Sequence, residues 1–301
     1  IIQKASGSDV VYGFWHQRQG QPVFAPFNNR NHLAGWMVMA FSLSAGFFGG
    51  CLARGLRGVK PDWRYRILWL STREASETVL SAFALVVMAT SVVLSASRSG
   101  LLCLVLAIAL QGAWAARRHA TGSRRTIGIA YLLFVLVMAA AWGRVDAVLQ
   151  RFERFRPDIG GRLAVWQDTL RIIDDFLLTG TGLNTYGIAM LHYQTVRDGY
   201  LYIEAHNDYL QILAEGGLLL GAPIIIALLL FTREVWRRFR EAADDTRTYW
   251  LRAGAVIGLC AIAVQEIVDF TLQMPGAAVL FVVLVAIAIH RPSHGARDSS
   301  V

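Results

Sequence analysis

The sequence predicts an all-α polytopic membrane protein, and three observations support this fold class. First, 55% of the 301 residues are hydrophobic. Second, only 17% are charged, whereas a soluble domain usually carries about 25% charged residues. Third, several apolar runs approach the roughly 20 residues that a helix needs to cross a bilayer, and the mean hydropathy is +0.43.

Seven apolar runs are candidate membrane spans: 33–53, 77–97, 100–116, 126–143, 209–231, 253–271 and 275–290. They divide the chain into a first segment (1–32), four spans with short loops (33–143), one large loop (144–208), three further spans (209–290) and a tail (291–301). The chain begins with Ile1, without an initiating Met or a signal peptide. We therefore expect a fragment whose earlier spans are missing.

Arginine predicts the orientation of these spans. Three arginine-rich segments, 54–74, 117–125 and 233–252, fall on one side if the spans alternate. The positive-inside rule makes that side the cytoplasm, together with the tail. The first segment, the turns at 97–100 and 272–276, and the large loop then lie outside. Much of the +8 net charge is in short loops between apolar runs, which speaks against a nucleic-acid partner.

The large outer loop has a composition of its own. It contains seven arginines, no lysine and nine acidic residues. Orientation does not require arginines on this side, and the guanidinium group is a planar fork suited to phosphate. The alternative is that these arginines pair with the acids or with lipid headgroups.

Residues 161–177 predict an amphipathic helix within this loop. Apolar residues recur at 163, 166, 170, 173 and 177, the spacing of one helix face. The segment is too charged to span a membrane, so we expect it to lie flat on the outer surface or against the spans. Gly180 and Gly182 should end the helix and begin a loop.

His206 is the first candidate for chemistry, because it stands just before the span that starts near residue 209. Asn207 or Asp208 can cap that helix, and the positive helix end disfavours an imidazolium. A neutral imidazole at the membrane surface can accept a proton from a hydroxyl group. The alternative is a histidine that only hydrogen-bonds the loop.

Three arginines are candidates for ligand binding. Arg98 lies in the short turn "SASRSG" between two apolar runs, where an arginine is either functional or reaches toward lipid headgroups. Arg162 opens the amphipathic helix one turn before Trp166, and an ion pair with Asp158 is its alternative role. Arg30, just outside the first span, binds a polar ligand or marks the interface.

Two acidic residues, Glu266 and Asp269, lie in or at the end of the sixth predicted span. Acids at that depth predict a partner such as a buried arginine, or a structural cap. No phosphate-binding loop, metal-spaced His/Cys set or nucleophile elbow is found in the sequence. Cys51, Cys103 and Cys260 have no pairing pattern and read as thiols in the membrane. We therefore expect no metal and no cofactor.

Taken in order, three motifs resemble the O-antigen ligase and Wzy-type polymerase family. They are "LSASRSGLL" (94–102), "GRLAVWQDTLRIIDDFLLTGTGLNTY" (161–186) and "EAHNDYLQILAEGGLLLG" (204–221). The segment "APFNNRNHLAGWM" (25–37) is also similar to one in that family. The resemblance runs from about residue 25 to about residue 290, although such proteins usually have more spans than the seven counted here.

The resemblance implies a bacterial inner-membrane enzyme with a GT-C-like helical bundle, acting on the periplasmic face. It implies inverting, metal-independent transfer of a glycan from undecaprenyl pyrophosphate to the lipid A core, or to another glycan or protein hydroxyl. His206 matches the proposed base, and Arg98 and Arg162 match the arginines thought to hold the donor pyrophosphate. The expected supporting residues are Asn207, Trp166, Arg30 and Glu215.

Three other functions remain open from the sequence. A Wzy-type glycan polymerase shares the same motifs. Some proteins of this family have been labelled as bicarbonate transporters, and Glu266 and Asp269 are the features that favour ion passage. A membrane scaffold explains the spans but not the set of arginines and histidine.

Overall fold

The computed structural model describes residues 29–55, 71–118, 155–195, 199–241 and 246–291, together with 10–11, 15–16 and the single residues Phe27, Arg64 and Trp69. The regular secondary structure within these ranges is helical apart from one small antiparallel pair of strands, β1 (Val10–Val11) and β2 (Trp15–His16). The prediction of a polytopic helical membrane protein is confirmed.

Eight α-helices are described, and they are listed here with one 3-10 helix. They are α2 (Arg30–Gly55), α4 (Arg73–Ser95), α5 (Arg98–Arg118), α8 (Phe155–Asp175), α9 (Tyr186–Tyr193), α10 (Asp208–Glu241), α11 (Thr246–Gln265), η1 (Thr271–Gln273) and α12 (Pro275–Ile289).

Five of the described helices, α2, α4, α5, α10 and α11, are long and apolar enough to cross a membrane. They correspond to five of the seven predicted spans. The sixth predicted span, 253–271, is misplaced at both ends, because the helix starts at Thr246 and ends at Gln265. The seventh is α12, an apolar helix of 15 residues. The predicted span 126–143 lies outside the described residues.

Helix α2 is the centre of the bundle and packs against α4, α5 and α11. Phe41 of α2 is completely buried, as are Leu85 of α4 and Leu104 of α5. Small residues bring α2 and α11 together: a Cβ atom on Gly46 would lie 2.4 Å from the carbonyl oxygen of Trp250. Close approach of backbones through small residues is a common way for membrane helices to pack.

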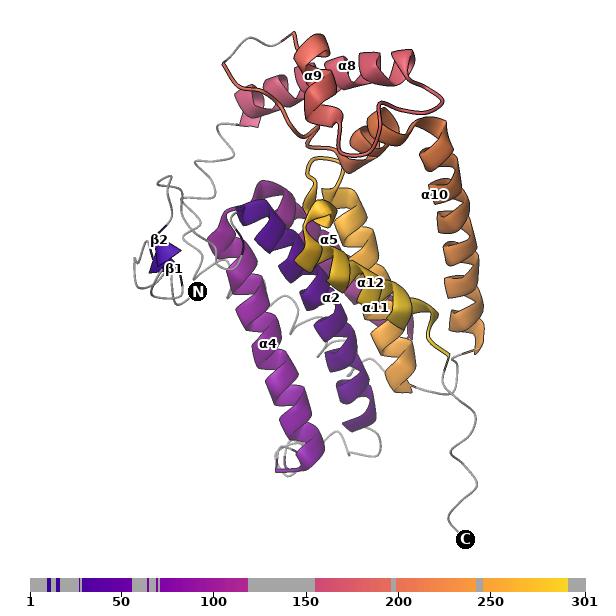
Figure 1. Ribbon diagram of the computed structural model, residues 1–301. Coiled ribbons are helices and arrows are strands. Elements are labelled where there is room, and N and C mark those ends of the chain that lie inside the picture. Colours follow the sequence, from indigo (N-terminus) through magenta and orange to yellow (C-terminus); the bar gives the residue numbers. More distant parts are fainter. Residues whose placement is uncertain are drawn as a thin grey trace.

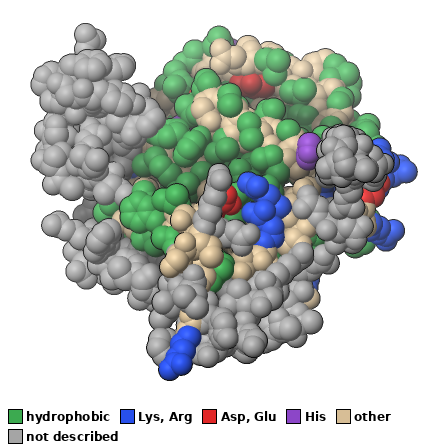
Figure 2. Space-filling model, turned by 90° about the horizontal axis from the view of Figure 1, so that it is seen from below, with side chains coloured by type: hydrophobic (Ala, Val, Ile, Leu, Met, Phe, Trp, Pro, Cys, Tyr) green, Lys and Arg blue, Asp and Glu red, His purple; other side chains and the backbone are tan. Residues whose placement is uncertain are grey.

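The alternating helix directions produce two different ends (Figure 1). One end, which we call the loop end, is where α2, α5, α10 and α12 begin and where α4 and α11 end. Helices α8 and α9 lie beyond these helix ends. The opposite end, which we call the arginine end, carries Arg54, Arg117, Arg237 and Arg240. Seen from the arginine end, Lys and Arg side chains lie close to acidic ones (Figure 2).

One arginine of the predicted cytoplasmic segment 233–252 has a structural role. Arg252 is 1% exposed, and its guanidinium group donates hydrogen bonds to the backbone carbonyls of Ala288, Arg238 and His290. It therefore joins α10, α11 and the end of α12. A buried guanidinium with its donors satisfied in this way contributes to packing as well as to the charge pattern.

The amphipathic helix α8 forms, but only part of the predicted apolar stripe is buried, with Ile173 at 8% exposure. Leu163, Leu170 and Leu177 are each about half exposed. The buried face instead includes Asp168 and Thr169, which are 1% and 0% exposed. These polar side chains can be buried because partners from the α9 region satisfy them: Thr169 bonds the hydroxyl of Tyr186 at 2.7 Å, and Asp168 accepts from the backbone and side chain of Thr195. The helix lies across the other helices at the loop end (Figure 1).

Glycines let the chain after α8 cross α10 at close range. Gly180 has φ +65 and ends the helical turn after α8, as the sequence predicts. A Cβ atom on Gly180 would lie 2.2 Å from the backbone of Glu215, and Gly217 (φ +55) interrupts α10 at the same crossing. Only glycine adopts these conformations without steric cost. The motifs around 180 and 216 thus form one structural unit.

Candidate active site

His206 lies at the loop end in a left-handed conformation, φ 51, two residues before α10 begins. Asn207 caps this helix, since its side-chain oxygen accepts from the backbone N–H of Leu210 at 3.1 Å. Burial, and then the positive charge of Arg162, lower the pKa of His206 to about 4. The ring is therefore neutral at neutral pH, as expected, although burial is the larger cause and the expectation rested on the helix dipole.

The backbone around His206 is fixed on both sides. Trp166 of α8 donates its indole N–H to the carbonyl of Ala205 at 3.0 Å. The N–H of Ala205 bonds the side chain of Gln211 at 3.0 Å, and the N–H of Asp208 bonds the carbonyl of Glu266 at 3.1 Å. The histidine is thus held between α8, α10 and the turn that follows α11.

The imidazole of His206 has one nitrogen without a partner. Its Nδ1 atom is buried and makes no hydrogen bond to the part of the chain that the structure describes. The ring packs edge-on against Phe270, with centroids 5.0 Å apart. The alternative of a histidine that only hydrogen-bonds its loop therefore finds no support at Nδ1.

Arg162 lies close to this histidine and reaches the same turn. Its Nη1 atom donates to the carbonyl of Val268 at 2.6 Å. Burial raises the pKa of the neighbouring Asp269 to about 6, and the positive charge of Arg162 acts in the opposite direction. The alternative ion pair with Asp158 concerns a side chain outside the described residues.

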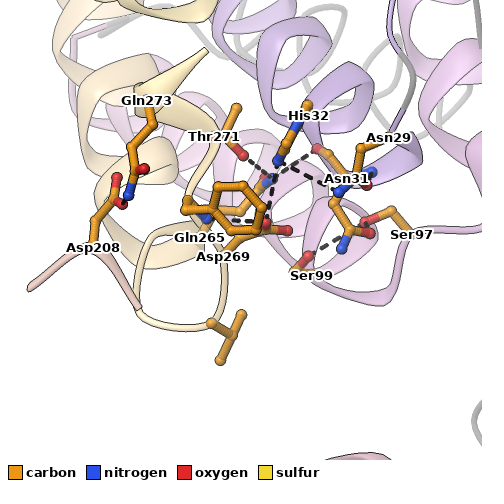
Figure 3. Close-up of polar contacts among 12 residues, drawn as sticks. Asn29, Asn31, His32, Ser97, Ser99, Asp208, Gln265, Asp269, Thr271 and Gln273 are labelled. Carbon is orange, nitrogen blue, oxygen red and sulfur yellow. Dashed lines mark hydrogen bonds and ion pairs between the residues drawn. The ribbon is translucent and has the colours of Figure 1, made fainter. Parts of the chain in front are cut away.

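Asp269 also faces α2, so the turn is tied to the first span. It is 0% exposed, and its Oδ1 lies 3.7 Å from Nε2 of His32 (Figure 3). Arg30, the first residue of α2, lies two residues before His32. Of the two acids, Asp269 thus has an arginine in its surroundings, Arg162 of α8, whereas the neighbour of Glu266 is Asp208.

Arg98 begins α5 at the same end, next to a separate set of polar contacts. The hydroxyl of Ser97 donates to the side chain of Asn31 at 2.8 Å, and the backbone carbonyl of Asn31 accepts from Gln265 at 3.0 Å (Figure 3). Because Asn31 precedes His32, these contacts connect the Ser-Arg turn to Asp269. Arg98 and Arg162 therefore belong to one end of the bundle, joined through α2.

Glu215, expected as a supporting residue, holds a loop. Its carboxylate accepts the backbone N–H groups of Asn184 and Tyr186 at 2.9 and 3.1 Å. These bonds fasten the start of α9 to α10. Glu215 therefore lies next to the crossing at Gly180 and Gly217 described above, and its supporting role stays a prediction.

An open pocket of about 350 Å³ lies beside His206. Residues 200–204, His206 and Phe270 line it. Gln194 fixes one wall, since its side-chain amide bonds the carbonyl of Tyr200 at 2.6 Å and the N–H of Tyr202 at 3.2 Å. The wall is therefore formed in advance of any ligand.

Glu204 adds an acid to this pocket. Its carboxylate accepts from Gln211 at 2.7 Å, and burial raises its pKa. Sequence reasoning missed both Glu204 and Phe270. The position of Glu204 two residues before His206 was visible in the sequence, but no spacing rule links Phe270 to His206, because packing across 64 residues brings them together. No cluster of three or more potential metal ligands occurs in the described ranges.

Comparison with known proteins gives one family match. Residues 83–225 match the model of the O-antigen ligase family. The match confirms the resemblance that the motifs predicted. It includes Arg98, Arg162 and His206, whereas Arg30 and the turn at 266–270 lie outside it. Neither curated proteins nor solved structures gave a match.

Proposed function

Because residues 83–225 match the O-antigen ligase family, we propose that the protein transfers a glycan from undecaprenyl pyrophosphate to an acceptor hydroxyl at the periplasmic face of the bacterial inner membrane. The family match supports glycan transfer in a membrane, of the ligase or polymerase type. The identity of the donor, the inversion at the anomeric carbon and the location of the site on the periplasmic face are parts of the proposal. The observation that carries it is a neutral His206 that lines a pocket at one end of the helical bundle and has the charge of Arg162 close by.

His206 is the general base in this proposal. With Nδ1 buried, Nε2 is the nitrogen that accepts the proton of the acceptor hydroxyl. The acceptor oxygen attacks the anomeric carbon of the donor sugar while the bond from that carbon to the phosphate oxygen breaks, which inverts the configuration. A base with a pKa of about 4 is unprotonated throughout the physiological range, so only its neutral state needs to be considered there.

Arg162 and Arg98 stabilise the departing pyrophosphate. The leaving group takes both electrons of the broken bond and gains negative charge, which guanidinium groups stabilise through paired N–H donors. One N–H of Arg162 is used by Val268, and this bond sets the direction of the remaining donors. Charge stabilisation by arginine supplies what the step requires at the phosphate.

The pocket beside His206 receives the acceptor. Tyr200, Tyr202 and Phe270 offer aromatic faces, and the carbon–hydrogen faces of a sugar ring pack well on such surfaces. Glu204 can accept a hydrogen bond from a sugar hydroxyl there. A glycan acceptor, as in the lipid A core, is the ligand that this lining favours.

Ion transport is the weaker explanation of Glu266 and Asp269. Asp269 lies against His32 and Arg162, and Glu266 lies beside Asp208. These contacts tie helices together at the loop end, which supports a role for both acids in holding the site.

Reconstitution of the full-length protein in liposomes tests the proposed function. The liposomes receive an undecaprenyl-pyrophosphate-linked glycan with either lipid A core or an excess of the same lipid-linked glycan. A single shifted product on lipid A core indicates a ligase, and a ladder on the lipid carrier indicates a polymerase. Absence of product with both acceptors contradicts the proposal.

A further inference from the structure

The turn of residues 266–270, between α11 and η1, contacts the candidate site at Arg162, Asp208 and His206. The carbonyl of Val268 accepts from Arg162, and the carbonyl of Glu266 accepts from the N–H of Asp208. Phe270 contacts His206. The turn lies more than 40 residues beyond the family match, which ends at 225.

Phe270 lies between two histidines. Its ring centroid is 5.0 Å from that of His206, with an interplanar angle of 67°, and 4.8 Å from that of His32, with an angle of 81°. Both are edge-to-face arrangements, which are favourable for aromatic rings and depend on their orientation. His32 is 5% exposed and is fixed between Asn29 and Asp269. One side of Phe270 is therefore braced by the bundle.

The orientation of the His206 ring depends on packing against a neighbour more than that of most catalytic histidines does. A catalytic histidine is usually oriented by a hydrogen bond from its second nitrogen to a third group. In His206 that nitrogen, Nδ1, is buried and makes no hydrogen bond to any residue that the structure describes. The carboxylate of Asp269, in the turn next to Phe270, faces His32 instead. The ring of His206 instead packs against Phe270.

We propose that Phe270 is a positioning residue. Its ring holds the imidazole of His206 so that Nε2 faces the pocket, and it shields the opposite side of the imidazole from water. The effect of Phe270 on catalysis rests on the proposed function, whereas the contact between Phe270 and His206 is independent of it. Phe270 also lines the pocket, so its ring separates the buried side of the histidine from the open one.

Water exclusion predicts a measurable property of His206. Burial is the largest cause that lowers its pKa to about 4. The charged and titratable groups on the elements that meet around it are Arg162, His32, Glu204, Asp208, Glu266 and Asp269. Replacing Phe270 by an aliphatic residue leaves all of these groups in place and admits water, so the pKa of His206 should rise toward its usual 6.5.

Site-resolved modification with diethyl pyrocarbonate tests this on the full-length protein in nanodiscs. The reagent modifies neutral imidazole, and mass spectrometry follows His206 alone as a function of pH. We expect a midpoint near 4 in the wild type and a clearly higher midpoint in Phe270→Leu and in Phe270→Met. Phe270→Tyr keeps the ring and should restore the wild-type midpoint. Phe176→Leu, at an aromatic residue just after α8, is the matched control.

Transfer kinetics add a second readout. In Phe270→Leu, kcat should fall about ten-fold or more, a part of what a general base contributes, while the donor KM stays unchanged. If Phe270 only stacks on the acceptor, Phe270→Leu would raise the acceptor KM and leave the labelling midpoint of His206 unchanged. That result would overturn the proposal. An unchanged midpoint in both Phe270→Leu and Phe270→Met also overturns it. If the wild type transfers no glycan, the proposed function fails, and the labelling midpoint still decides the role of Phe270.

Discussion

At the scale of single residues, the chemistry depends on how each charge is surrounded. His206 is neutral because it is buried, and Arg162 is fixed by a backbone carbonyl rather than by a carboxylate. Both residues were identifiable from motifs. Their partners Phe270 and Val268 were not, because in the stretch "EIVDF" only the two acids, Glu266 and Asp269, stand out in the sequence.

Replacing Arg162 by lysine should reduce transfer about 100-fold, the scale of losing one donor at a developing charge. An ammonium group is a point charge and cannot hold the carbonyl of Val268 and a phosphate with the geometry of a guanidinium fork. Initial rates at a series of donor concentrations measure this. Arg171→Lys, on the exposed face of the same helix, should keep wild-type rates. Equal rates in the two variants would contradict the role of Arg162.

At the scale of elements, the site is positioned by crossings and turns. The loop at 178–182 lies against α10 where Gly217 interrupts that helix, and Glu215 fastens the start of α9. The sequence predicted that Gly180 and Gly182 end a helix. It did not predict which face of α8 is buried, because buried Asp168 and Thr169 depend on partners that come from beyond α9.

Gly180→Ala should destabilise the protein by about 1–3 kcal/mol, the cost of a strained backbone, because the added Cβ meets the backbone of Glu215. Thermal unfolding in detergent should show a transition several degrees lower. Gly112→Ala is the control: its Cβ would meet no atom within 4 Å, and it lies in α5. A Gly180→Ala variant as stable as Gly112→Ala would show that the crossing is not tight.

Glu266 predicts a pH dependence of stability. Burial, and then the neighbouring Asp208, raise its pKa to about 9 from the usual 4.5. The folded protein thus keeps a proton that the unfolded chain releases above pH 4.5, and this contribution to stability is lost as pH rises toward 9. Glu266→Gln has no proton to lose.

This variant should unfold at a higher temperature than the wild type at pH 8.5 and at a similar temperature at pH 4.5. Tryptophan fluorescence during heating provides the measurement. A wild type whose relative stability does not change between these two pH values would exclude a raised pKa at Glu266.

At the scale of the whole molecule, the two ends of the bundle have separate tasks. The arginine end carries exposed ion pairs and the buried Arg252, and the loop end carries the candidate site. Hydropathy predicted most of the spans because long apolar runs leave few alternatives in lipid. It misplaced the end of α11, since the helix ends at Gln265 and the chain then turns, although Glu266 and Asp269 of this turn are buried.

The proposed orientation can be read from cysteine labelling. In a chain with Cys51, Cys103 and Cys260 replaced by alanine, His192→Cys reports on the loop end and Arg240→Cys on the arginine end. A maleimide that does not cross membranes should label residue 192 in intact spheroplasts and residue 240 only after permeabilisation. The reverse pattern would place the site in the cytoplasm and contradict the periplasmic assignment.

The most direct test of the central claim is glycan transfer by His206→Ala in liposomes, with unfolding temperature and donor binding measured on the same preparation. A general base contributes about 10²–10⁴-fold in rate. We therefore predict that transfer falls at least 100-fold, while the protein stays folded and still binds the lipid-linked donor through Arg162 and Arg98. Transfer at the wild-type rate by this variant would show that His206 is not the base.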